Sequence, residues 1–342
     1  MARGGRLTVR GAARSPSRAA AASARRSAAA ALAATLLAGC AAAPRFDASA
    51  VPAVELTDVP FFPQTDYQCG PAALATILAD QGLAVDAEDL VPAVYVEGLR
   101  GSLQPELLAA TRRYGLVPYA IEPDPTALFA ELESGRPVLV LQNLGFDRFP
   151  VWHYAVVIGY DAERERVLLR SGTERRRGEP LRRFLRSWMK ADRWGFVAAD
   201  PREPPSTAEP VSWIRALSGA APLLEPAAVD AAFEAAVDRW PGNEVVLFAA
   251  AERDAAAGRL DEAASGYEAL IALAPDHVAA RNNLANVLAE RGCRAAALRE
   301  ARAALALTKP DGPLRAAVED TVNTLTAAAA SGAGEAPGAC VH

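Results

Sequence analysis

One stretch of the sequence decides the fold: QTDYQCGPAALATIL, residues 64–78, in which a cysteine is followed by a Gly-Pro step and an apolar run. Pro71 suits the first turn of a helix, and the small and helix-forming residues after it continue the helix. The pattern therefore predicts that Cys69 lies at a helix N-terminus. Unsatisfied amides and the positive end of the helix dipole are expected to lower the pKa of a thiol there, which favours the nucleophilic thiolate.

A cysteine nucleophile needs a base, and the sequence holds three histidines: His153, His277 and His342. His342 ends the chain, and His277 follows a proline in a helical region. His153 begins HYAVVIGYD, residues 153–161, a β-rich run that would hold an imidazole rigidly on a strand. A cysteine on a helix and a histidine on a strand are typical of papain-like architecture. Cys69 and His153 are therefore the candidate catalytic pair.

With these two motifs, residues 59–200 resemble the papain-like cysteine peptidases that process bacteriocin leaders of the double-glycine type, and their stand-alone relatives. The resemblance implies an α+β papain-like fold, with a helix near 105–113 and a strand at 136–141 between the motifs. It also implies an oxyanion donor upstream of the cysteine. Gln64 matches that position, whereas the side chain of the adjacent Gln68 points less readily into the same hole.

The third catalytic residue of that family, an aspartate that orients the histidine ring, has no counterpart at the expected place. A hairpin at 161–165 would instead bring Ser171 or Thr173 of the next strand beside His153. The hydroxyl of Ser171 could accept a hydrogen bond from the ring, but it would stabilise an imidazolium less than a carboxylate does. Three further candidates for this role are Asp161, Asn143 and Glu174.

The chain opens with a basic segment, residues 1–39, that contains seven arginines and no acidic residue and ends in a short apolar run before Cys40. This pattern is typical of an export signal, and the run is too short to span a bilayer as a helix. Leu-Ala-Gly-Cys at its end resembles the lipobox of bacterial lipoproteins, which implies that Cys40 is lipidated and anchors the protein to a membrane. Ala41 fits the periplasmic face of an outer membrane, where the source has two membranes.

Beyond Pro226 the sequence favours helices and repeats itself at an offset of 34 residues, with 258–263 aligning on 292–297 and Pro241 on Pro275. This period is the tetratricopeptide signature, so an all-α repeat domain with a surface for a protein or peptide is expected. Two full units cover 244–311. A half unit at 230–240 and a helix at 313–328 would cap them.

The predicted organisation has six parts: a signal peptide (1–39), a tether (40–58), the papain-like domain (59–200), a Pro-rich linker (201–225), the tetratricopeptide-like repeats (226–328) and a disordered tail (329–342). No metal or cofactor is expected, because one cysteine and one histidine cannot complete a zinc site and no phosphate-binding loop is present. An oxidising envelope could join the remaining cysteines, Cys293 and Cys340. A net charge of −5, more negative still without the basic opening, argues against nucleic acid as a partner.

The leading hypothesis is peptide-bond hydrolysis through an acyl-enzyme on Cys69, with the helical repeats recruiting the substrate. Transfer of the acyl group to an amine would use the same thiolate. A catalytically silent peptide-binding module would account for the missing aspartate, although such a module has no need of a reactive cysteine.

Overall fold

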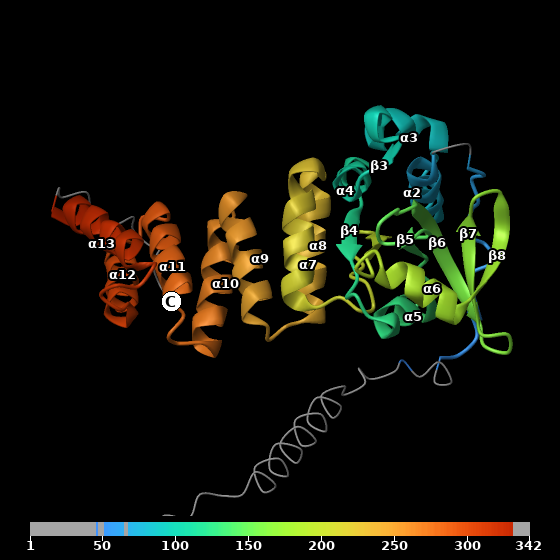
Figure 1. Cartoon of the computed structure of the whole chain (residues 1–342). Coiled ribbons are helices and arrows are strands. Elements are labelled where there is room, and N and C mark those ends of the chain that lie inside the picture. Colours follow the sequence, from blue (N-terminus) through green and yellow to red (C-terminus); the bar gives the residue numbers. More distant parts are fainter. Residues whose placement is uncertain (1–45, 47–50, 65–67, 331–342) are drawn as a thin grey trace, which may run out of the picture. The chain divides into compact units, whose positions relative to one another are not determined.

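The computed structural model describes residues 46, 51–64 and 68–330. Its first part is a seven-stranded antiparallel sheet in the order β4-β9-β5-β6-β7-β8, with β1 paired to β6 (Figure 1). The strands are β1 (Val54–Glu55), β4 (Val117–Ala120), β5 (Val138–Asn143), β6 (Trp152–Asp161), β7 (Arg166–Ser171), β8 (Glu174–Pro180) and β9 (Gly195–Ala199). A separate antiparallel pair joins β2 (Tyr95–Val96) and β3 (Gly101–Ser102).

Helices cover both faces of this sheet, because side chains alternate between the faces of each strand and both sets are apolar. Helix α2 (Cys69–Asp80) packs its Leu74 and Ile77 against Tyr154 and Val156 of β6, and α3 (Ala87–Val94) and α4 (Gln104–Arg113) extend this core. The other face is covered by α5 (Pro125–Glu133) and α6 (Leu181–Met189). A short 3-10 helix, η2 (Glu97–Leu99), lies between β2 and β3.

The folded part begins earlier than the sequence suggested. Strand β1 falls within the segment 40–58 that was expected to be a tether, and it pairs with Gly159 and Tyr160 of β6. An exposed ion pair of 2.6 Å between Glu55 and Arg176 of β8 accompanies this pairing. Residues 54–58 are therefore part of the sheet domain, since backbone pairing supplies the order that the Ala- and Pro-rich composition does not indicate.

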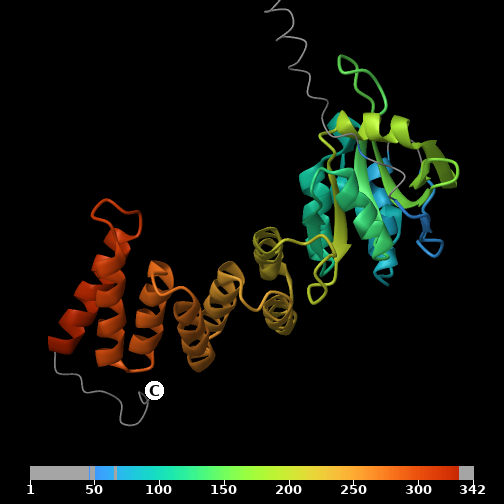
Figure 2. The same cartoon turned by 90° about the horizontal axis from the view of Figure 1, so that it is seen from below.

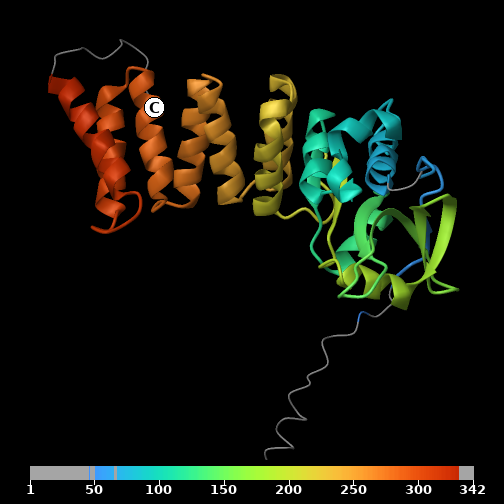
Figure 3. The same ribbon diagram turned by 45° about the horizontal axis from the view of Figure 1, so that its top comes forward.

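The second part consists of paired helices that repeat with the predicted period (Figures 2 and 3). The pairs are α7 (Pro210–Ala220) with α8 (Pro226–Arg239), α9 (Glu244–Ala256) with α10 (Leu260–Leu273), and α11 (Val278–Glu290) with α12 (Arg294–Leu307). Both helices of each pair start 34 residues after their counterparts in the preceding pair. Gly258 lies between the two helices of the second pair, and Gly292 lies at the equivalent place in the third pair. Their φ angles are 75° and 83°, a conformation that glycine adopts without strain. The chain is thus α+β followed by all-α helical repeats of the tetratricopeptide type, and α13 (Arg315–Ala330) comes last.

The segment 201–225 is not an irregular linker, which corrects the prediction. It contains α7 and a 3-10 turn, η3 (Ala221–Leu223), and α7 is the first helix of an additional repeat. The indole of Trp213 is fully buried and packs at 6.1 Å from the ring of Tyr119 in β4. The five prolines in this segment concealed the helix, although Pro210 stands at its first position, where proline is well tolerated.

Three predictions concern lipidation, disulfide pairing and membrane-spanning helices. Cys40, the lipidation candidate, lies outside the described residues, as does the tail after residue 330. Cys293 is disulfide-bonded, whereas its predicted partner, Cys340, lies outside the described residues. Within the described residues, none of the helices has the length and apolar character needed to cross a membrane.

The packing of α7 predicts a large cost for Trp213→Ala and almost none for Val211→Ala in the same helix. Trp213 is 0% exposed and Val211 is 49% exposed, so only the first change leaves a cavity. Truncating a buried tryptophan lowers the free energy of unfolding by about 3–5 kcal/mol, as urea denaturation would measure. Equal, small effects of the two changes would show that this segment behaves as a loose linker.

Candidate active site

Cys69 is the first residue of α2 and the free cysteine among the described residues. Its sulfur lies within hydrogen-bonding range of backbone N–H groups of Tyr154, Gly70 and Cys69 itself. Burial raises the pKa of the thiol, and these N–H groups lower it by less, so the net direction is upward. The expectation of a lowered pKa is therefore wrong for this conformation: the helix start is present, but the desolvation of a thiolate outweighs it.

The residue after the cysteine has to be glycine. A Cβ at Gly70 would overlap the hydroxyl of Ser102 in β3, so β3 closes directly over the start of α2. The Ser102 carbonyl accepts a hydrogen bond of 3.2 Å from the Tyr154 hydroxyl. The Ser102 Oγ is itself buried without a hydrogen-bond partner in the described part of the chain. Ser102 and Tyr154 thus lie beside the start of α2, where the thiol is.

His153 is the second residue of β6, and its Nε2 lies 2.8 Å from the Oγ of Ser171 in β7. Ser171 is 2% exposed. Burial, and to a smaller extent the nearby Arg177 guanidinium, lower the pKa of His153 to about 4. The imidazole is therefore neutral at physiological pH, in keeping with a neutral hydroxyl beside it.

The thiol of Cys69 and the imidazole of His153 are not hydrogen-bonded to each other in this conformation. The Tyr154 ring belongs to the core on the α2 face, so alternation along the strand turns the His153 side chain to the other face. Gln142, the cross-strand partner of His153, also points away from α2, because its amide donates to Ser187 of α6. The contact between the two candidates runs instead from the sulfur to the backbone N–H of Tyr154, the residue next to His153.

Of the four residues considered for orienting the ring, Ser171 is the one that contacts it. Asp161 accepts hydrogen bonds from the backbone and guanidinium of Arg164 in the turn after β6. Asn143 accepts from the backbone N–H groups of Gly145 and Val151. Glu174 is exposed and lies 3.7 Å from Arg177. The predicted hairpin between β6 and β7 is present and supplies the contact with Ser171.

Gln64 lies close to the turn after β7, which follows Ser171. Its backbone N–H donates a 3.0 Å hydrogen bond to the carbonyl of Gly172, the residue after Ser171. The segment that leads to Cys69 is thereby joined to the turn after β7. Gln68 precedes Cys69 directly and is the N-cap residue of α2, without a side-chain capping bond.

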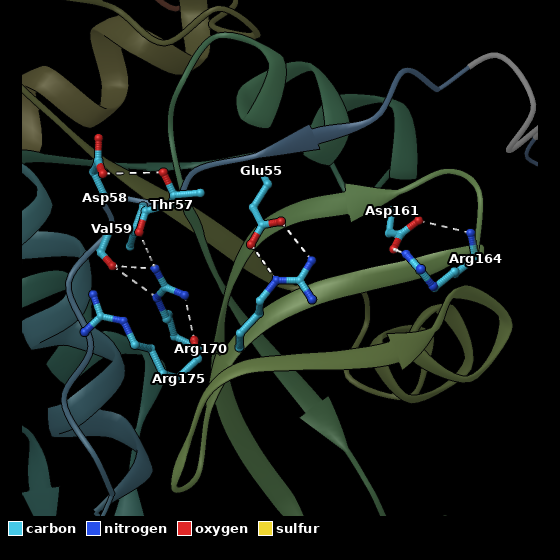
Figure 4. Close-up of polar contacts among 9 residues, drawn as sticks. Glu55, Thr57, Asp58, Val59, Asp161, Arg164, Arg170 and Arg175 are labelled. Carbon is cyan, nitrogen blue, oxygen red and sulfur yellow. Dashed lines mark hydrogen bonds and ion pairs between the residues drawn. The ribbon is translucent and has the colours of Figure 1, made fainter.

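A buried arginine holds this approach segment in position. Arg170, the neighbour of Ser171, is 5% exposed and donates to the carbonyls of Thr57 (2.9 Å), Val59 (2.7 Å) and Arg175 (2.6 Å) (Figure 4). The guanidinium thus joins the turn after β1 to the start of β8. An arginine at an inward-facing position of the apolar strand RVLLRS is the sequence signal that could have indicated this role.

A second buried polar group lies on the His153 face of the sheet. The Nε2 of Gln142 donates to Ser187 Oγ at 2.8 Å and to Glu179 Oε2 at 3.3 Å. Glu179 is 4% exposed and lies 3.3 Å from Arg183. This network joins β5, β8 and α6 beneath the strand that carries His153, and the sequence alone did not indicate it.

Comparison with known proteins identifies the first part of the chain. Residues 56–194 match the model of the Peptidase_C39-like family, so the sheet part is a C39-like, peptidase-type domain, followed by helical repeats. No curated protein matches the chain.

Three of the similar solved structures illustrate both parts. A C39-like peptidase from Bacillus anthracis shares 19% identity over 43% of this chain and 98% of its own, with a TM-score of 0.37. A double glycine motif protease from an AMS/PCAT transporter, in complex with the leader peptide, shares 22% identity over 42% of this chain and 91% of its own, with a TM-score of 0.32. The Yersinia enterocolitica type III secretion translocator chaperone SycD shares 15% identity over 35% of this chain and 83% of its own, with a TM-score of 0.32. Because these TM-scores are below 0.5, the assignment of the first domain rests on the family model.

Metal ligands are not clustered anywhere in the described ranges: no group of three or more His, Cys, Asp or Glu side chains could hold an ion there.

The buried imidazole predicts a loss of stability in acid. The pKa of His153 is about 4 in the folded protein and 6.5 as its ordinary value, so the unfolded chain binds a proton first as the pH falls. The free energy of unfolding should therefore decrease from pH 6.5 down through pH 4, by up to about 3 kcal/mol from this group. Urea denaturation of the wild type and of His153→Gln across this range would measure it. A pH dependence that is the same in both proteins would contradict the assignment.

The bonds of Arg170 predict a second stability effect. Arg170→Met leaves the carbonyls of Thr57 and Val59 without their buried donor, which costs about 1–3 kcal/mol for each unsatisfied group. Arg176→Met is the matched control, because it removes an ion pair that is half-exposed on its arginine side and worth at most about 1 kcal/mol. Thermal or urea denaturation compares the two, and equal losses would rule out a special role for Arg170.

Proposed function

We propose that the C39-like domain is a cysteine peptidase with Cys69 as nucleophile and His153 as general base. The observation that carries the proposal is the position of Cys69, which starts α2 and packs against the core that contains Tyr154 of β6, the residue adjacent to His153. This position brings the only free thiol among the described residues to the strand end that bears the imidazole. A nucleophile at a helix N-terminus with a base beside it is the arrangement that acyl-enzyme chemistry requires.

The resting pair in this proposal is a neutral thiol and a neutral imidazole, in agreement with the raised pKa of Cys69 and the lowered pKa of His153. We assign the Nε2–H tautomer, in which His153 donates to the Ser171 Oγ 2.8 Å away. The Nδ1 lone pair is then left to take the thiol proton as the sulfur attacks the substrate carbonyl. The ring has to turn about the end of β6 to reach the sulfur. Catalytic hydrogen bonds that are open in a free enzyme and close with substrate are common.

Charge that develops on the substrate carbonyl needs donors close to the sulfur. The backbone N–H of Cys69 lies at the start of α2, and we propose that the carboxamide of Gln64 joins it. The backbone bond between Gln64 and Gly172 supports this role, because it ties the glutamine to the turn beside Ser171. Donors fixed before the reaction stabilise an oxyanion without reorganising.

The substrate of this proposed peptidase is a protein or peptide recruited by the helical repeats. A cavity of about 200 Å³ between α9 and α11 supports this step, and its polar lining includes Glu252, Asn283, Asn286 and Glu290. We further propose that acylation of Cys40 holds the protein at the bacterial cell envelope, on the periplasmic face of the outer membrane. The lipobox-like sequence before Cys40 is the basis for that part.

A second candidate function is a peptide-binding module that performs no chemistry. The absence of a hydrogen bond between the thiol and the imidazole, within the described structure, favours it. Transfer to an amine in place of water would be a variant of the first function with the same residues.

The test combines turnover with thiol reactivity. A peptide library is incubated with the full-length protein, and new termini are mapped by mass spectrometry for the wild type, Cys69→Ala, His153→Ala, Gln64→Ala and the control His277→Ala. We expect cleavage to vanish in Cys69→Ala, to fall by ~10²–10⁴ in His153→Ala and by ~10²–10³ in Gln64→Ala, and to be unchanged in His277→Ala.

The pH dependence of kcat/KM distinguishes a neutral thiol and imidazole in the resting enzyme from a thiolate–imidazolium ion pair. Because the base must be neutral, kcat/KM should fall only when the pH drops through about 4. Cleavage that persists in Cys69→Ala would refute the mechanism. Absence of cleavage, together with an alkylation rate of Cys69 that His153→Ala leaves unchanged, would assign the silent module. Amine adducts among the products would assign transfer.

A further inference from the structure

A short hairpin projects from the sheet directly before His153. Residues 144–152 continue β5 and β6 through three backbone hydrogen bonds, with Leu144 donating to Val151 and with Phe146 and Phe149 donating to each other's carbonyls at 3.2 and 3.0 Å. A two-residue turn, Asp147-Arg148, closes it. The register places Leu144, Phe146, Phe149 and Val151 on one face of the hairpin, because opposite residues and those two apart share a face. We call these four side chains the hairpin face.

The hairpin face is apolar and uncovered. Phe146 is 77% exposed, Phe149 76% and Val151 56%. Such exposure is costly in water, and burying one phenylalanine side chain contributes about 1.5–3 kcal/mol. Contiguous apolar side chains left in solvent by a folded domain mark an interaction surface.

The hairpin is braced and holds its phenyl groups out in a fixed arrangement. Asn143 accepts from the backbone of both arms, Gly145 and Val151, at 3.0 Å. Lys190, which follows α6, donates to the Gly145 carbonyl at 2.8 Å and lies 5.9 Å from the centre of the Phe146 ring. The exposed phenyl rings are therefore built into the fold rather than left by a loose loop.

Basic side chains lie on the hairpin and on the helix next to it. Lys190 and Arg148 lie at the hairpin itself, and the exposed side of α6 carries Arg182, Arg183 and Arg186, of which Arg183 pairs with Glu179. The acidic Asp147 at the turn is within 3.8 Å of Lys190, which compensates its charge. A chain with a net charge of −5 thus gathers positive charge next to its most exposed aromatic side chains.

We infer that the hairpin face and the arginines of α6 form a contact site for a lipid bilayer that carries anionic headgroups. Aromatic side chains are favoured at the level of the headgroups, and arginine and lysine bind the phosphates there. A protruding two-residue tip can insert into the headgroup region of a bilayer, whereas peptides are bound in grooves or along open sheet edges. The inference does not rest on the proposed peptidase activity.

The test locates the contact within the full-length protein, so that attachment through other segments does not obscure it. Phe149→Trp places an indole at the tip, and Leu314→Trp places one at an exposed leucine of the repeat region as a control. Fluorescence is measured on vesicles of brominated phosphatidylcholine with or without phosphatidylglycerol. We expect quenching beyond that of the wild type for Phe149→Trp on the anionic vesicles and none for Leu314→Trp.

Removal of each component should weaken the contact by a different route. Phe146→Ser/Phe149→Ser should reduce vesicle affinity by at least about tenfold, and Arg182→Gln/Arg186→Gln by about fivefold per arginine at low salt. Equal quenching of both tryptophan variants, or none for Phe149→Trp on vesicles to which the protein is bound, would overturn the inference. So would protein that fails to bind the vesicles. If Phe146→Ser/Phe149→Ser instead raises KM for a peptide without changing vesicle affinity, the surface binds substrate and not lipid.

Discussion

The arrangement of the site depends on one buried cation. Arg170 lies within the sheet, and its guanidinium donates to backbone carbonyls of two segments, residues 57–59 and the start of β8. A buried guanidinium is tolerated only when its N–H groups are satisfied, and this requirement fixes where residues 57–59 can run. Gln64 and Cys69 follow that segment, and Ser171 follows Arg170 directly. The same side chain therefore sets the spacing between the segment that leads to Cys69 and the strand whose Ser171 contacts His153.

The elements that carry the site were predictable because each has a strong local signal. Helix α2 follows from the Gly-Pro step and the small residues after Cys69, and β6 from an unbroken β-branched and aromatic run. The placement of Ser171 or Thr173 beside His153 followed from strand alternation and a short hairpin, which are properties of the backbone, and the structure shows that Ser171 makes the contact. The 34-residue period likewise predicted two repeat units over 244–311, the range in which α9 to α12 lie, because repeated units have the same length.

The features that the sequence did not reveal depend on packing. Helix α7 was mistaken for part of a linker because five prolines dominate the composition of residues 201–225. The burial of Trp213 against Tyr119 is a contact between distant segments, which the composition does not show. The pKa of Cys69 was predicted in the wrong direction because a helix N-terminus is visible in a sequence and desolvation is not. Gln142 and Glu179 lack motifs altogether, and packing alone brings them to the His153 face of the sheet.

The raised pKa of Cys69 has a consequence for the survival of the protein. Peroxides and disulfides are attacked by thiolates and only very slowly by thiols, so a cysteine that stays protonated at rest resists sulfenylation and mixed-disulfide formation. A peptidase that relies on its base only while substrate is bound would expose a thiolate for brief intervals alone. In an oxidising compartment such an enzyme would react more slowly than one with a permanent thiolate, but its thiol would be oxidised less often and would not need a reductant to restore it.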